Sequence, residues 1–168
     1  EGWDENHPLQ ATLFGMPDFK DENTKTVKIP DFLKKKWKKE GHKNDAWVNP
    51  SAVKLRKDHK WNPSQYVAAW IASWVEEFGI DGVRCDIVEN THLYRWKELS
   101  DACNQALATW RKNHPEDPAS QWTDAFYMTG DFDKASIDYK ADYAEAGFSS
   151  MVNFYFPKQG DLDDIVYT

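Results

Sequence analysis

Helical and strand-like segments alternate through most of this chain, and this alternation restricts the possible folds more than any other feature of the sequence. Residues 63–78 and 92–112 repeat apolar side chains at helical spacing. Residues 79–86, 125–131 and 148–154 are short and apolar, and glycine or polar residues bound them, as is typical of buried strands. Strands that alternate with helices are joined by right-handed crossovers into a parallel sheet. The sequence therefore predicts an α/β fold with parallel strands.

The two ends of the chain are less regular. Residues 1–60 contain several prolines and no lasting apolar period, so we predict an irregular excursion there. Residues 61–168 hold the alternating pattern and form the predicted α/β unit, with two weaker helices expected over residues 137–146 and 161–167.

The charge distribution excludes one class of partner. The net charge of −7 arises in residues 61–168, because residues 1–60 carry 13 Lys and Arg against 10 Asp and Glu. An acidic, aromatic-rich region does not suit nucleic acid, whose phosphates need a positive face, but it suits a neutral polar ligand such as a sugar. The lysine-rich residues 34–39 are predicted to be a solvated helical face. No apolar run of membrane-spanning length and no signal peptide is visible, as is also true of a mature secreted protein.

The strand predicted over residues 79–86 carries charged side chains at its end. Successive side chains of a strand point to opposite faces, so Arg84 and Asp86 share one face and Cys85 lies on the other. Spacing alone leaves two interpretations open, a structural ion pair and a catalytic carboxylate. Cys85 is predicted to be a buried free thiol, as is Cys103, although the two could meet beneath the sheet.

Asp131 ends the next predicted strand, so two consecutive strands deliver a carboxylate to the same edge of the sheet. In parallel α/β folds the chemistry takes place at the carboxyl ends of the strands. Neighbouring strands lie about 4.8 Å apart, and two carboxyl groups about 5 Å apart are what a retaining glycosidase needs. Arg84 is expected to lower the pKa of Asp86 and keep it ionised.

The residues around these carboxylates resemble a known family. Residues 79–86, with the sequence GIDGVRCD, resemble the Gly-(Phe/Leu)-Arg-x-Asp motif of the α-amylase family, glycoside hydrolase family 13. The resemblance implies that Asp86 is the nucleophile at the end of the fourth barrel strand, with Arg84 beside it. Residues 128–131 resemble the fifth-strand motif that carries the general acid, which implies that role for Asp131.

Two further segments occur in the order that the family has. Residues 13–19 resemble the Leu-Pro-Asp-Leu segment near the end of the long excursion after strand three, and residues 147–154 resemble the sixth strand. The resemblance implies that residues 1–60 are the end of that excursion, and that residues 61–168 form about three strands of a (β/α)8 TIM barrel. The open sheet edges are then expected to be covered by other parts of the same barrel or by other chains.

The chain departs from the family at several positions. The family's acid is Glu, and Asp131 is one methylene shorter, a displacement on the order of 1 Å that can cost about a hundredfold in rate. The resemblance implies sugar contacts from Glu89 and Asn90, although the family often has Lys-His at these positions. His92 lies near the same strand end and is a candidate for binding sugar by stacking. Trp122 is a further candidate for stacking on sugar. The Asp-x-x-x-Asn-His and Asn-His-Asp segments of the family do not occur.

The resemblance implies a retaining hydrolase of α-1,4-glucans such as starch and maltodextrin, of whose catalytic domain this chain is a part. The alternative is a relative that binds glucan or has a structural role and has lost catalysis, as Asp131 and the missing motifs permit. A phosphate-binding or redox domain is set aside because no glycine-rich loop follows a predicted strand. The family also implies calcium, for which the sequence assigns no site, and it favours a secreted or periplasmic location.

Overall fold

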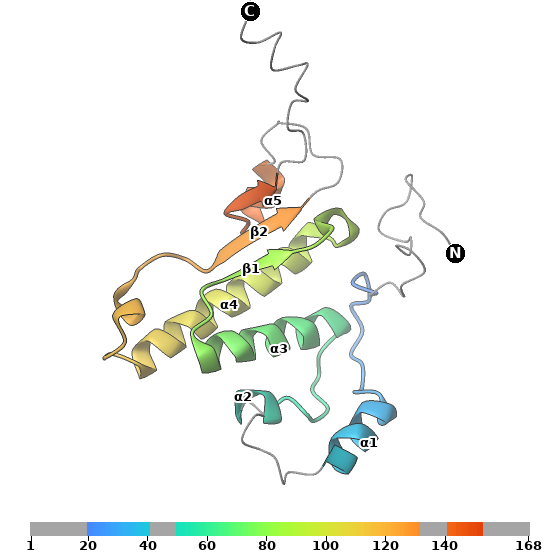
Figure 1. The fold of residues 1–168 in the computed structure, drawn as a ribbon. Helices are drawn as coiled ribbons and strands as arrows, with labels where there is room; N and C mark the ends of the chain where they lie inside the picture. The colour runs from blue at the N-terminus through green and yellow to red at the C-terminus, as the bar shows by residue number, and fades with distance from the viewer. Residues whose placement is uncertain (1–19, 41–49, 132–140, 153–168) are drawn as a thin grey trace, which may run out of the picture.

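The computed structural model describes residues 20–40, 50–131 and 141–152, and these form a small parallel sheet with its main helices on one side (Figure 1). The sheet has the order β1-β2-β3, and both strand pairs are parallel. Its strands are β1 (Gly82–Cys85), β2 (Tyr127–Asp131) and β3 (Ser150–Val152). The predicted α/β class with parallel strands is confirmed.

The helices follow the predicted order. Long helices precede and follow β1, as the apolar periods of residues 63–78 and 92–112 predict. The α-helices are α1 (Asp31–Glu40), α2 (Pro50–Val53), α3 (Pro63–Phe78), α4 (Leu93–Asn113) and α5 (Ala141–Glu145), and the 3-10 helices are η3 (Val88–Asn90) and η4 (Pro118–Gln121). None of the helices in the described ranges is long and apolar enough to cross a membrane.

Both ends of α3 are fixed by specific local contacts. Asn62 and Gln65 form a reciprocal capping box, in which each side chain accepts a hydrogen bond of 3.0 Å from the other residue's backbone N–H. The helix ends at Gly79, which has a φ of 66°. A Cβ atom at this position would lie 2.3 Å from the indole of Trp110 on α4, so both the backbone conformation and the packing require glycine.

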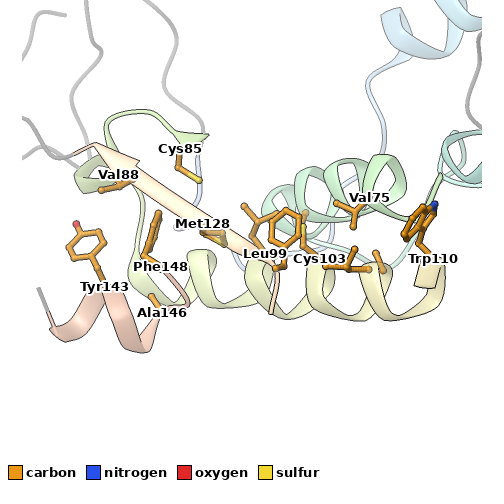
Figure 2. Packing of buried hydrophobic residues seen from close by; sticks show 14 residues of the cluster. Val75, Cys85, Val88, Leu99, Cys103, Trp110, Met128, Tyr143, Ala146 and Phe148 are labelled. Carbon is orange, nitrogen blue, oxygen red and sulfur yellow. The ribbon is translucent and has the colours of Figure 1, made fainter. Parts of the chain in front are cut away.

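The core lies between the sheet and the pair of helices α3 and α4 (Figure 2). Side chains from the inward face of the sheet, such as Met128, pack onto α4, and Val75 of α3 completes the layer. Cys85 and Cys103 both lie in this core as free thiols, as predicted, and burial raises their pKa values to about 11 and about 12. The core formed by the described residues thus lies on one face of the sheet.

The segment that precedes α3 is more regular than predicted, because α1 and α2 lie within it. The lysine-rich residues do form a helical face, in α1, and Lys34 pairs with Asp58 at 2.7 Å. Asp58 also accepts a 2.9 Å hydrogen bond from the backbone N–H of Ile29, and both bonds lower its pKa. These contacts connect α1 to the chain that leads into α3.

Several predictions concern residues outside the described ranges. These are residues 13–19, the helix expected over 161–167, the first part of the helix expected over 137–146, and the last two residues of the strand expected over 148–154. Within the described part, the last two elements are shorter than predicted, as α5 and β3.

Candidate active site

The parallel register of β1 and β2 brings the two predicted carboxylates together. Cys85 of β1 pairs with Gly130 of β2, so the residues that follow them, Asp86 and Asp131, lie side by side. Cys85 is buried among the core residues, whereas the side chain of Arg84 is 61% exposed on the opposite face. The alternation predicted for this strand end is therefore present, and the charged side chains lie on the face away from α3 and α4.

The two aspartates differ sharply in exposure. The side chain of Asp86 is 76% exposed, and that of Asp131 is 7% exposed. One guanidinium nitrogen of Arg84, Nη2, forms an ion pair with Asp131 Oδ2 and lies 3.5 Å from Asp86 Oδ1. Asp131 Oδ1 accepts a hydrogen bond from the backbone N–H of Ile87. Both oxygens of the buried carboxylate are thus held as acceptors, as an ionised carboxylate requires.

The pKa values of the pair shift in opposite directions. Burial alone would raise the pKa of Asp131, but its hydrogen bonds from Ile87 N–H, Arg84 and Asp86 outweigh burial and lower it. The hydrogen bond to Asp131 and its negative charge raise the pKa of Asp86, against the opposing effect of Arg84. The expected lowering of the Asp86 pKa is therefore wrong in its net direction, because the hydrogen bond to Asp131 and the charge of Asp131 outweigh the effect of Arg84. As the pH falls, Asp86 therefore gains a proton before Asp131 does.

The turn after Asp86 has an unusual backbone. Ile87 has a φ of 48° and a ψ of 60°, and it is the one non-glycine residue with positive φ among the described residues. A β-branched residue in this region costs on the order of 1–3 kcal/mol. Nothing in the sequence around Ile87 signals this conformation, since left-handed turns normally carry Gly or Asn.

The residues predicted to contact sugar lie in or after this turn. Glu89 and Asn90 belong to η3 and are half-buried. The charge of Glu89, after burial, contributes to raising the pKa of Tyr143 to about 12, which places Glu89 close to α5. The side-chain Oδ1 of Asn90 is buried and has no hydrogen-bond partner in the described part of the chain.

His92 lies in a different environment from the two carboxylates. Its backbone N–H donates a 2.7 Å hydrogen bond to Asp21 Oδ2, and its Nδ1 lies 2.8 Å from the same oxygen. Arg95, which is buried, donates from Nε to the backbone carbonyl of Asp21 at 2.8 Å. His92 thus joins the start of α4 to residues more than 70 positions earlier. The sequence reasoning missed Asp21 because it stands in a polar stretch with no motif.

A hollow lies on the exposed face of the sheet, nearer the amino ends of the strands. It has a volume of about 590 Å³. Arg84 and Thr129 line it on the side toward the carboxylates, whereas Trp122 precedes β2 and lies at its far side. Trp122 is 55% exposed. The structure therefore places Trp122 at the end of β2 opposite to Asp131.

Calcium binds six to eight oxygen atoms, with carboxylates prominent among them. The described residues contain no group of three or more His, Cys, Asp and Glu side chains placed to hold a metal ion. No such cluster within the described ranges supports a calcium site, and the calcium that the family implies stays a prediction.

The chain matches no family model. It is 28% identical over 151 residues to the periplasmic alpha-amylase of Escherichia coli (strain K12), an alignment that covers 90% of the chain. The chain spans about a fifth of the length of that relative, 20%. Together with carboxylates at the ends of adjacent parallel strands, this similarity relates the chain to the α-amylase family.

Proposed function

We propose that the protein that carries this chain is a retaining glycoside hydrolase that acts on α-1,4-glucans such as starch and maltodextrin. The observation that supports this function best is the pair Asp86 and Asp131 at the carboxyl ends of adjacent parallel strands, with Arg84 in contact with both. Two carboxyl groups on one edge of a parallel sheet are the machinery for cleaving a glycosidic bond with retention.

In the proposed reaction Asp86 is the nucleophile and Asp131 is the acid and base. The exposed Asp86 is open to a sugar, and it must be ionised to act as a nucleophile. In the reactive form Asp131 Oδ2 carries a proton, Asp86 is ionised, and Arg84 Nη2 has moved toward Asp86. Asp131 then protonates the leaving oxygen while Asp86 forms the glycosyl ester, and water attacks the ester with Asp131 as base.

We further propose that the sheet is part of a (β/α)8 barrel, in which residues 1–60 belong to the excursion before the fourth strand. The exposed face of the sheet, with its hollow, would then be covered by other parts of the same barrel, since the chain spans only a fifth of the relative. Glu89, Asn90 and His92 are proposed to lie near the bound glucan. Because the relative is periplasmic, we propose a secreted or periplasmic location.

The test is hydrolysis of maltooligosaccharides by the protein that carries this chain, with the anomeric form of the product followed by NMR. We expect the α-anomer to appear first. The substitution Asp86→Asn should lower kcat by a factor on the order of 10⁴ or more, because it removes the covalent nucleophile. The matched control is Asp81→Asn, an exposed aspartate before β1, which should leave the rate within about twofold. Equal rates for the two variants would refute the assignment.

A second candidate is a relative that binds α-glucan or has a structural role without catalysis. One observation favours it, namely that both oxygens of Asp131 act as acceptors, which leaves no proton to donate in this arrangement. If the wild-type protein binds maltooligosaccharides but does not cleave them, and Asp131→Glu gives no activity, this second function holds. An increase in rate on Asp131→Glu instead supports a proton donor at this position.

A further inference from the structure

The peptide between Asp86 and Ile87 is the most constrained piece of backbone at the carboxylate pair. Ile87 adopts a φ of 48° although its branched side chain disfavours that conformation. Such a residue keeps its conformation only where its surroundings determine it. The direction of this peptide also sets the direction of Asp86, because Asp86 immediately precedes it.

Contacts on each side of Ile87 hold the turn in place. The N–H of Ile87 donates to Asp131 Oδ1, at an N···O distance of 2.5 Å. The carbonyl of Val88 accepts a 3.0 Å hydrogen bond from the indole N–H of Trp96. Val88 is fully buried against Gly130, where a Cβ atom would lie 2.7 Å from Val88 Cγ1. Among these contacts, only the bond to Asp131 involves the peptide that follows Asp86.

The two oxygens of Asp131 therefore have different partners. Oδ2 faces Arg84 and Oδ1 faces the Ile87 N–H. A carboxyl group that gains a proton on one oxygen still accepts a hydrogen bond on the other. Proton transfer at Oδ2 is thus compatible with a bond at Oδ1 that persists through the reaction.

We propose that Asp131 is also a positioning residue, whose Oδ1 holds the strained Asp86–Ile87 peptide and thereby fixes the direction of the Asp86 carboxylate. This inference rests on the proposed function only in so far as Asp86 is taken as the nucleophile. The bond itself exists whether or not the protein cleaves glucan, so the two claims are tested separately.

The first experiment separates positioning from proton donation. Asp131→Asn keeps an oxygen that accepts from Ile87 N–H, whereas Asp131→Ala removes it. The substrate is α-maltosyl fluoride, whose leaving group needs no proton donor, so loss of the acid affects both variants alike. We expect Asp131→Ala to be about ten- to a hundredfold slower than Asp131→Asn, the scale of a misplaced nucleophile. Equal rates would overturn the proposal.

Adding Ile87→Gly to each variant completes a double-mutant cycle. Glycine adopts positive φ without strain, so the turn no longer depends on the bond to residue 131. We expect Ile87→Gly to raise the rate severalfold in the Asp131→Ala background and by less in the Asp131→Asn background. The same change in both backgrounds would show that Asp131 does not act through this peptide.

The second experiment needs no activity. The Ile87 amide proton is followed by NMR as the pH falls, in the wild-type protein and in Asp131→Asn. We expect its chemical shift to follow the ionisation of Asp131 in the wild type and to lose that dependence in Asp131→Asn, while its protection from hydrogen exchange is kept. If the chemical shift of the Ile87 amide proton does not change with pH in the wild-type protein, the proposal is overturned. Absence of glucan cleavage with a pH-sensitive amide would overturn the proposed function alone.

Discussion

The ends of β1 and β2 carry the same residue type in opposite surroundings. Asp86 at the end of β1 is 76% exposed, and its pKa is raised by the neighbouring carboxylate. Asp131 at the end of β2 is 7% exposed, yet its pKa is lowered. Burial alone would give the reverse order, since it disfavours the charged form.

The difference arises from hydrogen-bond donors. Asp131 receives the Ile87 N–H and the closer contact of Arg84, whereas Asp86 receives a guanidinium nitrogen at 3.5 Å. The Ile87 N–H and the position of Arg84 therefore decide which of the two carboxyls has the lower pKa. Exposure of a carboxylate is a poor guide to its charge when a neighbour competes for the same donor.

Removal of that arginine should have the largest effect on stability and activity, because Arg84 contacts the carboxylates at both strand ends. In Arg84→Met the buried Asp131 loses its charge-assisted hydrogen bond, and we expect the free energy of unfolding to fall by about 1.5–3 kcal/mol. Hydrolysis of maltooligosaccharides should fall by about a hundredfold or more, because the guanidinium that contacts both carboxylates is lost. Urea denaturation and steady-state rates measure the two effects.

Arg84→Lys is the matched control for this prediction. Lysine keeps the positive charge, but it does not reproduce the planar guanidinium that reaches both carboxylates. We expect about half of the stability loss seen with Arg84→Met and an intermediate rate. If Arg84→Met is as stable as the wild type, Asp131 does not depend on this ion pair.

Gly130→Ala tests the packing behind the end of β2. An added Cβ atom would lie 2.7 Å from Val88 Cγ1 and 2.8 Å from Phe148 Cε1, so the turn after Asp86 must shift. We expect a loss of about 1–2 kcal/mol in the free energy of unfolding, typical of overpacking in a core. Thr129→Ala, on the opposite face of β2, is the control and should cost less. Equal losses would mean that the turn adapts to the new methyl group.

Much of the fold can be predicted from the sequence, because the long helices have recognisable capping residues and apolar periods. The start and end of α3 are visible as Asn62, Pro63 and Gly79, and the observed bounds of Pro63–Phe78 agree with residues 63–78. The strands that follow are short and apolar, and their parallel pairing was expected from the alternation. Before Asn62 the helical face of α1 was expected from its lysine-rich residues, whereas α2 was missed, since four residues show too little periodicity.

The candidate site was predictable only in part. Neighbouring strand ends explain why Asp86 and Asp131 meet. No local pattern indicates that Ile87 has positive φ, because its N–H donates to a distant acceptor, Asp131, 44 residues away. The partner of His92 was equally hidden, because Asp21 lies 71 residues earlier. Contacts over such separations depend on the tertiary fold.

The pH dependence of stability gives the smallest expected effect and tests the raised pKa of Asp86. A raised folded-state pKa contributes stability that is fully present below the unfolded value of about 3.9 and is lost as pH rises through the folded value. Above both values the ionised Asp86 therefore destabilises the fold. We expect Asp86→Asn to raise the free energy of unfolding at about pH 7 by less than about 1 kcal/mol, since solvent screens so exposed a group.

The gain from Asp86→Asn should vanish at about pH 3, where Asp86 is protonated in the wild-type protein as well. Asp131 contributes with the opposite sign. Its lowered pKa stabilises the fold above the unfolded-state pKa, and this stabilisation is lost as the pH falls through the folded-state pKa. Urea denaturation across this pH range, with Asp81→Asn as the control for net charge, isolates the Asp86 contribution. If the increase in the free energy of unfolding stays constant with pH, the charge of Asp131 does not raise the pKa of Asp86. The two strand ends would then differ in exposure alone.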